Sequence, residues 1–71
     1  MEQVALKERT RRLNLVKGIL QRLNITDKEK FIAEQSIAQG VTEAKMKEYV
    51  RLLIKAGYVK ESGLMFEWVG K

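Results

Sequence analysis

The hydrophobic pattern of this sequence changes its period at Gly57. Before this glycine, apolar residues recur three and four positions apart, which is the spacing of amphipathic helices. After it, Phe66 and Trp68 alternate with other residues between Leu64 and Val69, which is the two-residue period of a half-buried strand. The chain is therefore expected to build helices first and to end in a β-hairpin.

Two helices are expected in the first 40 residues. The first covers about Val4–Asn24, and the second begins after Thr26 or Asp27, either of which can cap its free amides. Gly40 is placed to end the second helix in a left-handed conformation. The residues expected on the buried sides are Leu6, Leu13, Leu15, Val16, Ile19, Leu20 and Leu23 in the first helix, and Phe31, Ile32, Ile37 and Ala38 in the second.

A third helix and a hairpin are expected in the remaining residues. Thr42 can cap this helix, and Glu43 in its first turn complements the helix dipole. Two short strands at Tyr58–Lys60 and Leu64–Val69 enclose a loop in which Gly63 supplies the positive φ that hairpin turns require. The residues expected on the buried side of the third helix are Met46, Tyr49, Val50, Leu53 and Ile54.

The order helix, helix, short turn, helix, hairpin is that of a winged helix-turn-helix. We therefore predict a mainly α fold with a small β-hairpin, consisting of three helices and a two-stranded antiparallel wing. Seventy-one residues are enough for one domain. That domain is expected to span residues 1–71, with its core in about 11–69 and residues 1–10 frayed or serving as a linker.

The composition argues against catalysis and metal binding. The chain has no Cys and no His, so the common nucleophilic dyads and triads and the usual zinc ligands are missing. The five glycines are too scattered to form a phosphate-binding loop. No catalytic, cofactor-binding or metal-binding residue and no small-molecule substrate is expected, so the chain is predicted to act by binding.

The hydrophobic segments of the sequence also indicate where in the cell the chain is located. No apolar run approaches the roughly 20 residues that a membrane-spanning helix needs, and the N-terminal residues do not resemble a secretory signal. We therefore expect no membrane partner and a cytoplasmic location, with nucleoid association in a prokaryote.

The net charge of +5 suggests a polyanionic partner, although its distribution is uneven. Residues 1–24 contain six basic and two acidic side chains, whereas residues 25–71 contain eight and seven. On the third helix, Lys47, Arg51 and Lys55 are four residues apart and form one basic stripe, and Glu43 is placed to pair with Lys47. The residues predicted to contact DNA or a partner are Thr42, Lys45, Lys47, Arg51, Lys55 and Lys60.

The contact expected from these side chains is independent of DNA sequence. Lys and Arg mostly neutralise phosphates, and the third helix lacks the Asn and Gln side chains that read adenine. The alternative is that these cations are simply a solvated helix face. A second candidate surface is the basic face of the first helix, formed by Arg9, Arg11, Arg12 and Lys17, which would follow a phosphate backbone or receive an acidic partner.

The run Lys30–Met46 resembles the second helix and turn of the C-terminal winged helix of archaeal minichromosome maintenance (MCM) helicases. The continuation Leu52–Glu61 is similar to their third helix and hairpin, and Arg11–Leu23 is similar to their first helix. The resemblance implies a regulatory and partner-docking appendage of a hexameric, ATP-driven DNA helicase. Such a module would contact DNA or initiator proteins weakly, and the ATPase motifs of the family are absent from these residues.

Two other functions are consistent with the same residues. One is a free-standing transcription regulator of archaeal, viral or plasmid origin that binds duplex DNA, which the initial Met1 favours because the chain would then be complete. The other is a protein-docking winged helix with no role in nucleic-acid binding. The dependence of DNA affinity on salt distinguishes these hypotheses, because each phosphate contact releases counterions.

Overall fold

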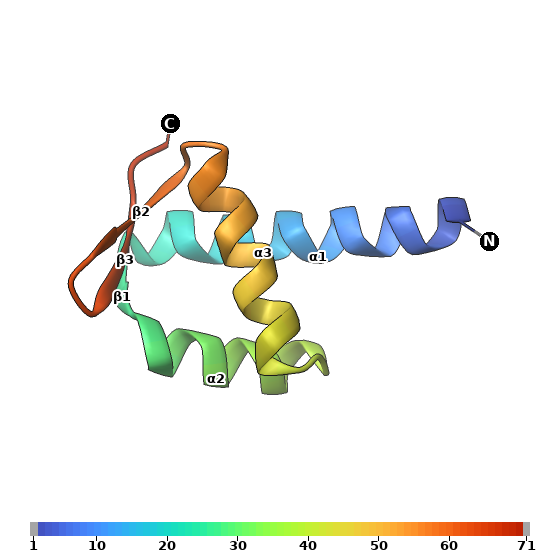
Figure 1. Cartoon of the computed structure of the whole chain (residues 1–71), viewed down its shortest axis with the longest axis horizontal. Coiled ribbons are helices and arrows are strands. Elements are labelled where there is room, and N and C mark those ends of the chain that lie inside the picture. Colours follow the sequence, from blue (N-terminus) through green and yellow to red (C-terminus); the bar gives the residue numbers. More distant parts are fainter. Residues whose placement is uncertain (1, 71) are drawn as a thin grey trace.

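The structure is a computed structural model that describes the backbone of residues 2–70 and the side chains of residues 7–70. Within this described part there are three helices and three strands, and Figure 1 shows α2, α3 and the strands gathered at one end of α1. Although α1 is long, neither it nor another helix within the described residues is apolar enough to cross a bilayer. The elements in chain order are α1 (Glu2–Leu23), β1 (Ile25–Asp27), α2 (Lys28–Gln39), α3 (Glu43–Lys55), β2 (Val59–Ser62) and β3 (Met65–Trp68).

This order confirms the winged-helix architecture, with one correction to the sheet. The wing has three strands instead of two, because β1 pairs antiparallel with β3 and the strand order is β1-β3-β2. Beyond the ends of β1, the N–H of Trp68 donates to the carbonyl of Asn24 at 2.6 Å, and the N–H of Lys28 donates to the carbonyl of Leu64 at 2.9 Å. The hairpin is therefore attached directly to the start of α2.

The hairpin loop is tighter than the sequence predicts. Ser62 pairs with Met65, which leaves a two-residue turn at Gly63 and Leu64. Gly63 has φ +61°, as the sequence predicted, and L side chains rarely adopt this conformation. The first strand of the hairpin therefore extends to Ser62, two residues further than the predicted Lys60.

The helix boundaries follow local signals in the sequence. The side chain of Asp27 accepts a hydrogen bond from the N–H of Lys30 at 2.9 Å, and the hydroxyl of Thr42 accepts one from the N–H of Lys45 at 3.1 Å. Gly40 ends α2 with φ 64°. The predicted caps at Asp27, Gly40 and Thr42 are therefore confirmed, because each depends on residues close in sequence.

All three helices and the hairpin contribute to one core. The rings of Phe31 and Phe66 meet edge to face with centroids 6.2 Å apart, and the half-buried Trp68 stacks on Tyr58 with centroids 5.7 Å apart. Phe66 is thus buried and Trp68 partly so, which matches the half-buried strand that their alternation predicts. The buried apolar residues are Val16, Leu20, Phe31, Ile32, Met46, Tyr49, Val50, Leu53, Val59 and Phe66.

Several residues expected in the core lie at the surface. Ile37 is 83% exposed, and Leu15 and Leu23 are about half exposed. On α2 the buried position belongs to Ser36, whose hydroxyl donates to the carbonyl of Ile32 and so satisfies its polar atom inside the core. Ile37 follows Ser36 by one residue and turns about 100° further round the helix, away from the core. Ala38 is also exposed, whereas the side chain of Leu6 lies outside the described part of the chain.

Candidate nucleic-acid interface

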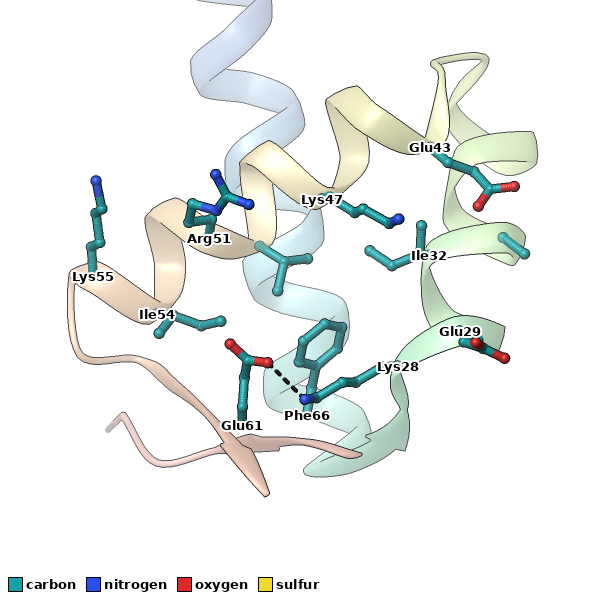
Figure 2. A pocket seen from close by; sticks show the side chains of 12 residues that line it. Lys28, Glu29, Ile32, Glu43, Lys47, Arg51, Ile54, Lys55, Glu61 and Phe66 are labelled. Atoms are coloured by element: carbon teal, nitrogen blue, oxygen red, sulfur yellow. Dashed lines mark hydrogen bonds and ion pairs between the residues drawn. The ribbon is translucent and has the colours of Figure 1, made fainter. Parts of the chain in front are cut away.

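An open groove with a volume of about 540 Å³ lies between α2, α3 and the hairpin (Figure 2). Its floor is formed by the core side chains of Ile32, Val50 and Phe66, with the half-buried Ile54 beside them. Helix α1 runs behind this floor. The groove is thus apolar at its base, and its rim consists of charged side chains from all three surrounding elements.

The predicted basic stripe forms one wall of the groove. Lys47, Arg51 and Lys55 are all exposed, and successive members are only about 40° apart round α3. Figure 2 shows Lys47 extending across the mouth of the groove toward Ile32, whereas Arg51 and Lys55 point away from Glu61. None of the three cations forms an ion pair with another residue whose side chain the structure describes.

The other two candidates, Lys45 on α3 and its N-cap Thr42, do not join this stripe. Lys45 precedes Lys47 by two residues, so it points about 160° away round the helix, and its ammonium group lies 3.4 Å from Glu48. The hydroxyl of Thr42 is occupied as a helix cap. The expected ion pair between Glu43 and Lys47 is not formed, although both side chains are within the described residues.

The hairpin contributes ion pairs instead of free cations. Lys60 lies 3.6 Å from Glu67 on the neighbouring strand, which leaves the predicted hairpin cation paired. Lys28, which is not among the residues predicted from the sequence, lies 2.6 Å from Glu61 and 5.8 Å from the centre of the Phe66 ring. The position of Lys28 depends on strand β1. Because the sequence did not predict this strand, it did not predict that Lys28 lines the groove either.

Acidic side chains limit the positive potential of the groove. Glu29 at the start of α2, Glu43 at the start of α3 and Glu61 on β2 all line it. Four basic side chains face them, namely Lys28, Lys47, Arg51 and Lys55. A polyanion would therefore be attracted mainly to Lys47, Arg51 and Lys55 on α3. It would be repelled by the three glutamates.

The basic residues of α1 do not form a single face. Because each residue turns about 100°, the directions of Arg9, Arg11, Arg12 and Lys17 are spread round the whole helix. The ammonium group of Lys17 lies 3.9 Å from the centre of the Tyr58 ring, so this cation is held against the hairpin aromatics. Helix α1 therefore presents isolated charges, in contrast to the continuous row on α3.

Neither metal-binding geometry nor a known relative suggests another site. The described residues contain no group of three or more His, Cys, Asp or Glu side chains placed to hold a metal ion. No family model matches the chain, and comparisons with curated proteins and with solved structures gave no match. The interpretation of the site therefore rests on its own geometry and charge.

Proposed function

We propose that this chain is a non-catalytic winged-helix module that binds duplex DNA weakly, and without sequence preference, through α3. The observation that carries the proposal is the row of Lys47, Arg51 and Lys55, which are exposed and lack carboxylate partners within the described residues. Four residues of helix advance about 6 Å, so the three charges form a linear array along the helix axis. Such an array suits a run of phosphates.

Two features support weak and sequence-independent binding. Lys and Arg side chains neutralise phosphates at any sequence, and α3 offers no Asn or Gln to read a base edge. The carboxylates of Glu29, Glu43 and Glu61 on the same face oppose the phosphate charge. The two-residue turn of the wing also leaves little chain to reach into a minor groove.

The setting that we propose is an accessory domain of a DNA replication helicase, in which the module contacts DNA, initiator proteins or the rest of the helicase. Support for this setting comes from the sequence resemblance of Arg11–Leu23, Lys30–Met46 and Leu52–Glu61 to archaeal MCM winged helices. A protein-docking role is the second candidate, and the half-buried Ile54 beside the apolar floor of the groove favours it.

The proposal is tested by fluorescence anisotropy with a labelled duplex of mixed sequence at several salt concentrations. Three phosphate contacts predict a slope of about −2.7 in log K against log salt, which is roughly a 40-fold loss of affinity from 50 to 200 mM. We expect a dissociation constant weaker than about 1 µM at physiological salt, close to the range of non-specific binding. A sequence-specific regulator with six or more contacts would lose about 10³-fold or more.

Substitutions identify the surface involved. Changing Lys47, Arg51 and Lys55 together to Ala is expected to remove most of the affinity. Lys45→Ala is the matched control, because it removes one positive charge from the opposite side of the same helix and is expected to have little effect. Nanomolar binding to one sequence would contradict the proposal in favour of a transcription regulator, and an unchanged affinity in the triple variant would contradict the α3 surface.

The chemical shifts of backbone amides provide an independent map. Titration with duplex DNA should shift amides of α3 near Lys47 and Arg51 more than those of α1 near Arg9 and Arg12. Shifts concentrated on α1 would transfer the DNA contact to that helix. The absence of shifts at millimolar DNA would instead leave protein docking as the function of the groove.

A further inference from the structure

One face of α1 carries a pattern that the packing of this chain does not use. Glu8, Leu15 and Arg22 are seven residues apart, so they lie nearly in line along the helix, with a drift of only about 20° per step. All three are exposed, and Leu15 is 51% exposed although it is a large aliphatic residue. Arg11 and Gly18 lie three residues after Glu8 and Leu15, so they flank this line on the same side of the helix, and Leu15 is the large apolar side chain among the five positions.

Two further features of α1 have no explanation within the chain. Figure 1 shows its N-terminal part extending beyond the other elements, and the side chains of residues 7–11 are all exposed. Helical turns without tertiary packing are marginal in water. In addition, Gly18 costs about 1 kcal/mol relative to Ala inside a helix. Beyond the adjoining residues and backbone of its own helix, a Cβ atom at this position would meet no described atom within 4 Å, so packing against the other elements does not require the glycine.

We infer that this face of α1 is a self-association surface, on which a second copy of the chain packs its own α1 in the antiparallel direction. The charges favour this occupant, because the line reads negative at Glu8, apolar at Leu15 and positive at Arg22. In an antiparallel pair centred on Leu15, Glu8 lies opposite the partner's Arg22, and the two Leu15 side chains meet at the twofold axis. A parallel pair would place like charges opposite each other.

The neighbouring positions are consistent with the same pairing. Arg11 falls opposite the partner's Ile19, which packs against its own core but is only half-buried, so the aliphatic stem of Arg11 can cover its exposed part while the charged end reaches water. Gly18 falls opposite the partner's Arg12, where the missing side chain leaves room for a long one. Because the contact consists of one helix pair, it belongs to the smallest class of interfaces, and we expect a dissociation constant on the order of tens of micromolar.

Sedimentation equilibrium of the whole chain tests the inference over about 5 to 500 µM, a range that brackets this affinity. Glu8→Arg and Arg22→Glu should each weaken the dimer at least about fivefold, since each creates two like-charge contacts. Combining both substitutions should restore the dimer, because it exchanges the two signs. Leu15→Glu should abolish association, whereas Ile37→Glu, at a more exposed isoleucine on α2, is the matched control and should not. These side chains are exposed, so circular dichroism should show an unchanged fold.

Disulfide cross-linking tests the orientation, and the absence of cysteine from the sequence keeps this test clean. Leu15→Cys should cross-link to itself under mild oxidation, whereas Glu8→Cys should not. A mixture of Glu8→Cys and Arg22→Cys chains should form a mixed disulfide. A monomer throughout the concentration range, a failure of the charge exchange to restore association, or equal self-cross-linking of Glu8→Cys and Leu15→Cys would each overturn the inference. None of these readouts involves DNA, so their outcome is independent of the proposed function.

Discussion

The ammonium group of Lys28 lies 2.6 Å from a carboxylate oxygen of Glu61, which connects the first residue of α2 to strand β2. One quarter of the Lys28 side chain is exposed, compared with 55% of Glu61, so water screens the pair. Such a pair contributes at most about 1 kcal/mol to the free energy of unfolding. Its larger consequence is electrostatic, because Glu61 neutralises a lysine that faces the groove.

Glu61→Gln is therefore expected to increase DNA affinity. The substitution frees Lys28 and removes a negative charge near the bound phosphates, which should improve binding by about two- to fivefold at low salt. Fluorescence anisotropy with duplex DNA measures the change. Glu34→Gln is the control, because Glu34 is exposed and does not line the groove. An equal gain from both variants would show that overall net charge, not the position of Glu61, determines the affinity.

Gly70→Ala is expected to destabilise the fold. A Cβ atom at this position would lie 2.7 Å from Cδ1 of Tyr58 and 3.1 Å from Cζ2 of Trp68, which are stacked on each other. Overpacking of this kind costs about 1 to 3 kcal/mol. Thermal unfolding followed by Trp68 fluorescence should report a lower melting temperature.

Gly18→Ala provides the comparison, because a methyl group there meets open space. At concentrations below dimerisation it should raise the free energy of unfolding by about 0.5 to 1 kcal/mol, since alanine stabilises a helix interior. A similar loss of stability in both glycine variants would contradict the close contact at Gly70.

Met46→Ala is expected to cause a large loss of stability, and Ile37→Ala almost none. Met46 is fully buried, so its truncation leaves a cavity and should cost about 2 to 5 kcal/mol. Ile37 is 83% exposed and should cost less than about 0.5 kcal/mol. Urea denaturation measures both. If Ile37→Ala were the more destabilising change, α2 would have to bury a different face from the one described.

Thr42→Ala is expected to reduce stability without a direct effect on DNA binding. The hydroxyl of Thr42 accepts the N–H of Lys45, and loss of such a cap costs about 1 kcal/mol. Thr42→Ser keeps the hydroxyl and should retain most of the stability. Anisotropy under conditions in which the variants stay folded should give the affinity of the original chain. A loss of DNA affinity in folded Thr42→Ala that Thr42→Ser does not share would show that Thr42 contacts DNA.

The sequence predicted correctly those residues of the candidate site that share one side of a single helix. Lys47, Arg51 and Lys55 share a side of α3 because their spacing is close to a helical turn, and the structure places them together. The same rotation of about 100° per residue places Lys45 on the other side of α3, where it pairs with Glu48. Lys45 is predicted as a contact from the sequence because it stands near the leading end of the helix, and nearness along the chain does not show direction round the helix.

Local chemistry in the sequence determined where the elements begin and turn. The hydrogen bonds of Asp27 and Thr42 join residues three positions apart, and the positive φ angles of Gly40 and Gly63 are properties of single residues. These interactions need no distant partner. They are therefore readable before the chain is folded.

Tertiary packing decided which surfaces these elements bury and which charges remain free. Strand β1 has only three residues and exists because β3 supplies its hydrogen bonds. Burial of Ser36 in place of Ile37 depends on how α2 lies against the core, and the Lys28–Glu61 pair joins residues that only the sheet brings together. Such contacts are set by the packing of segments far apart in sequence, which no local pattern specifies.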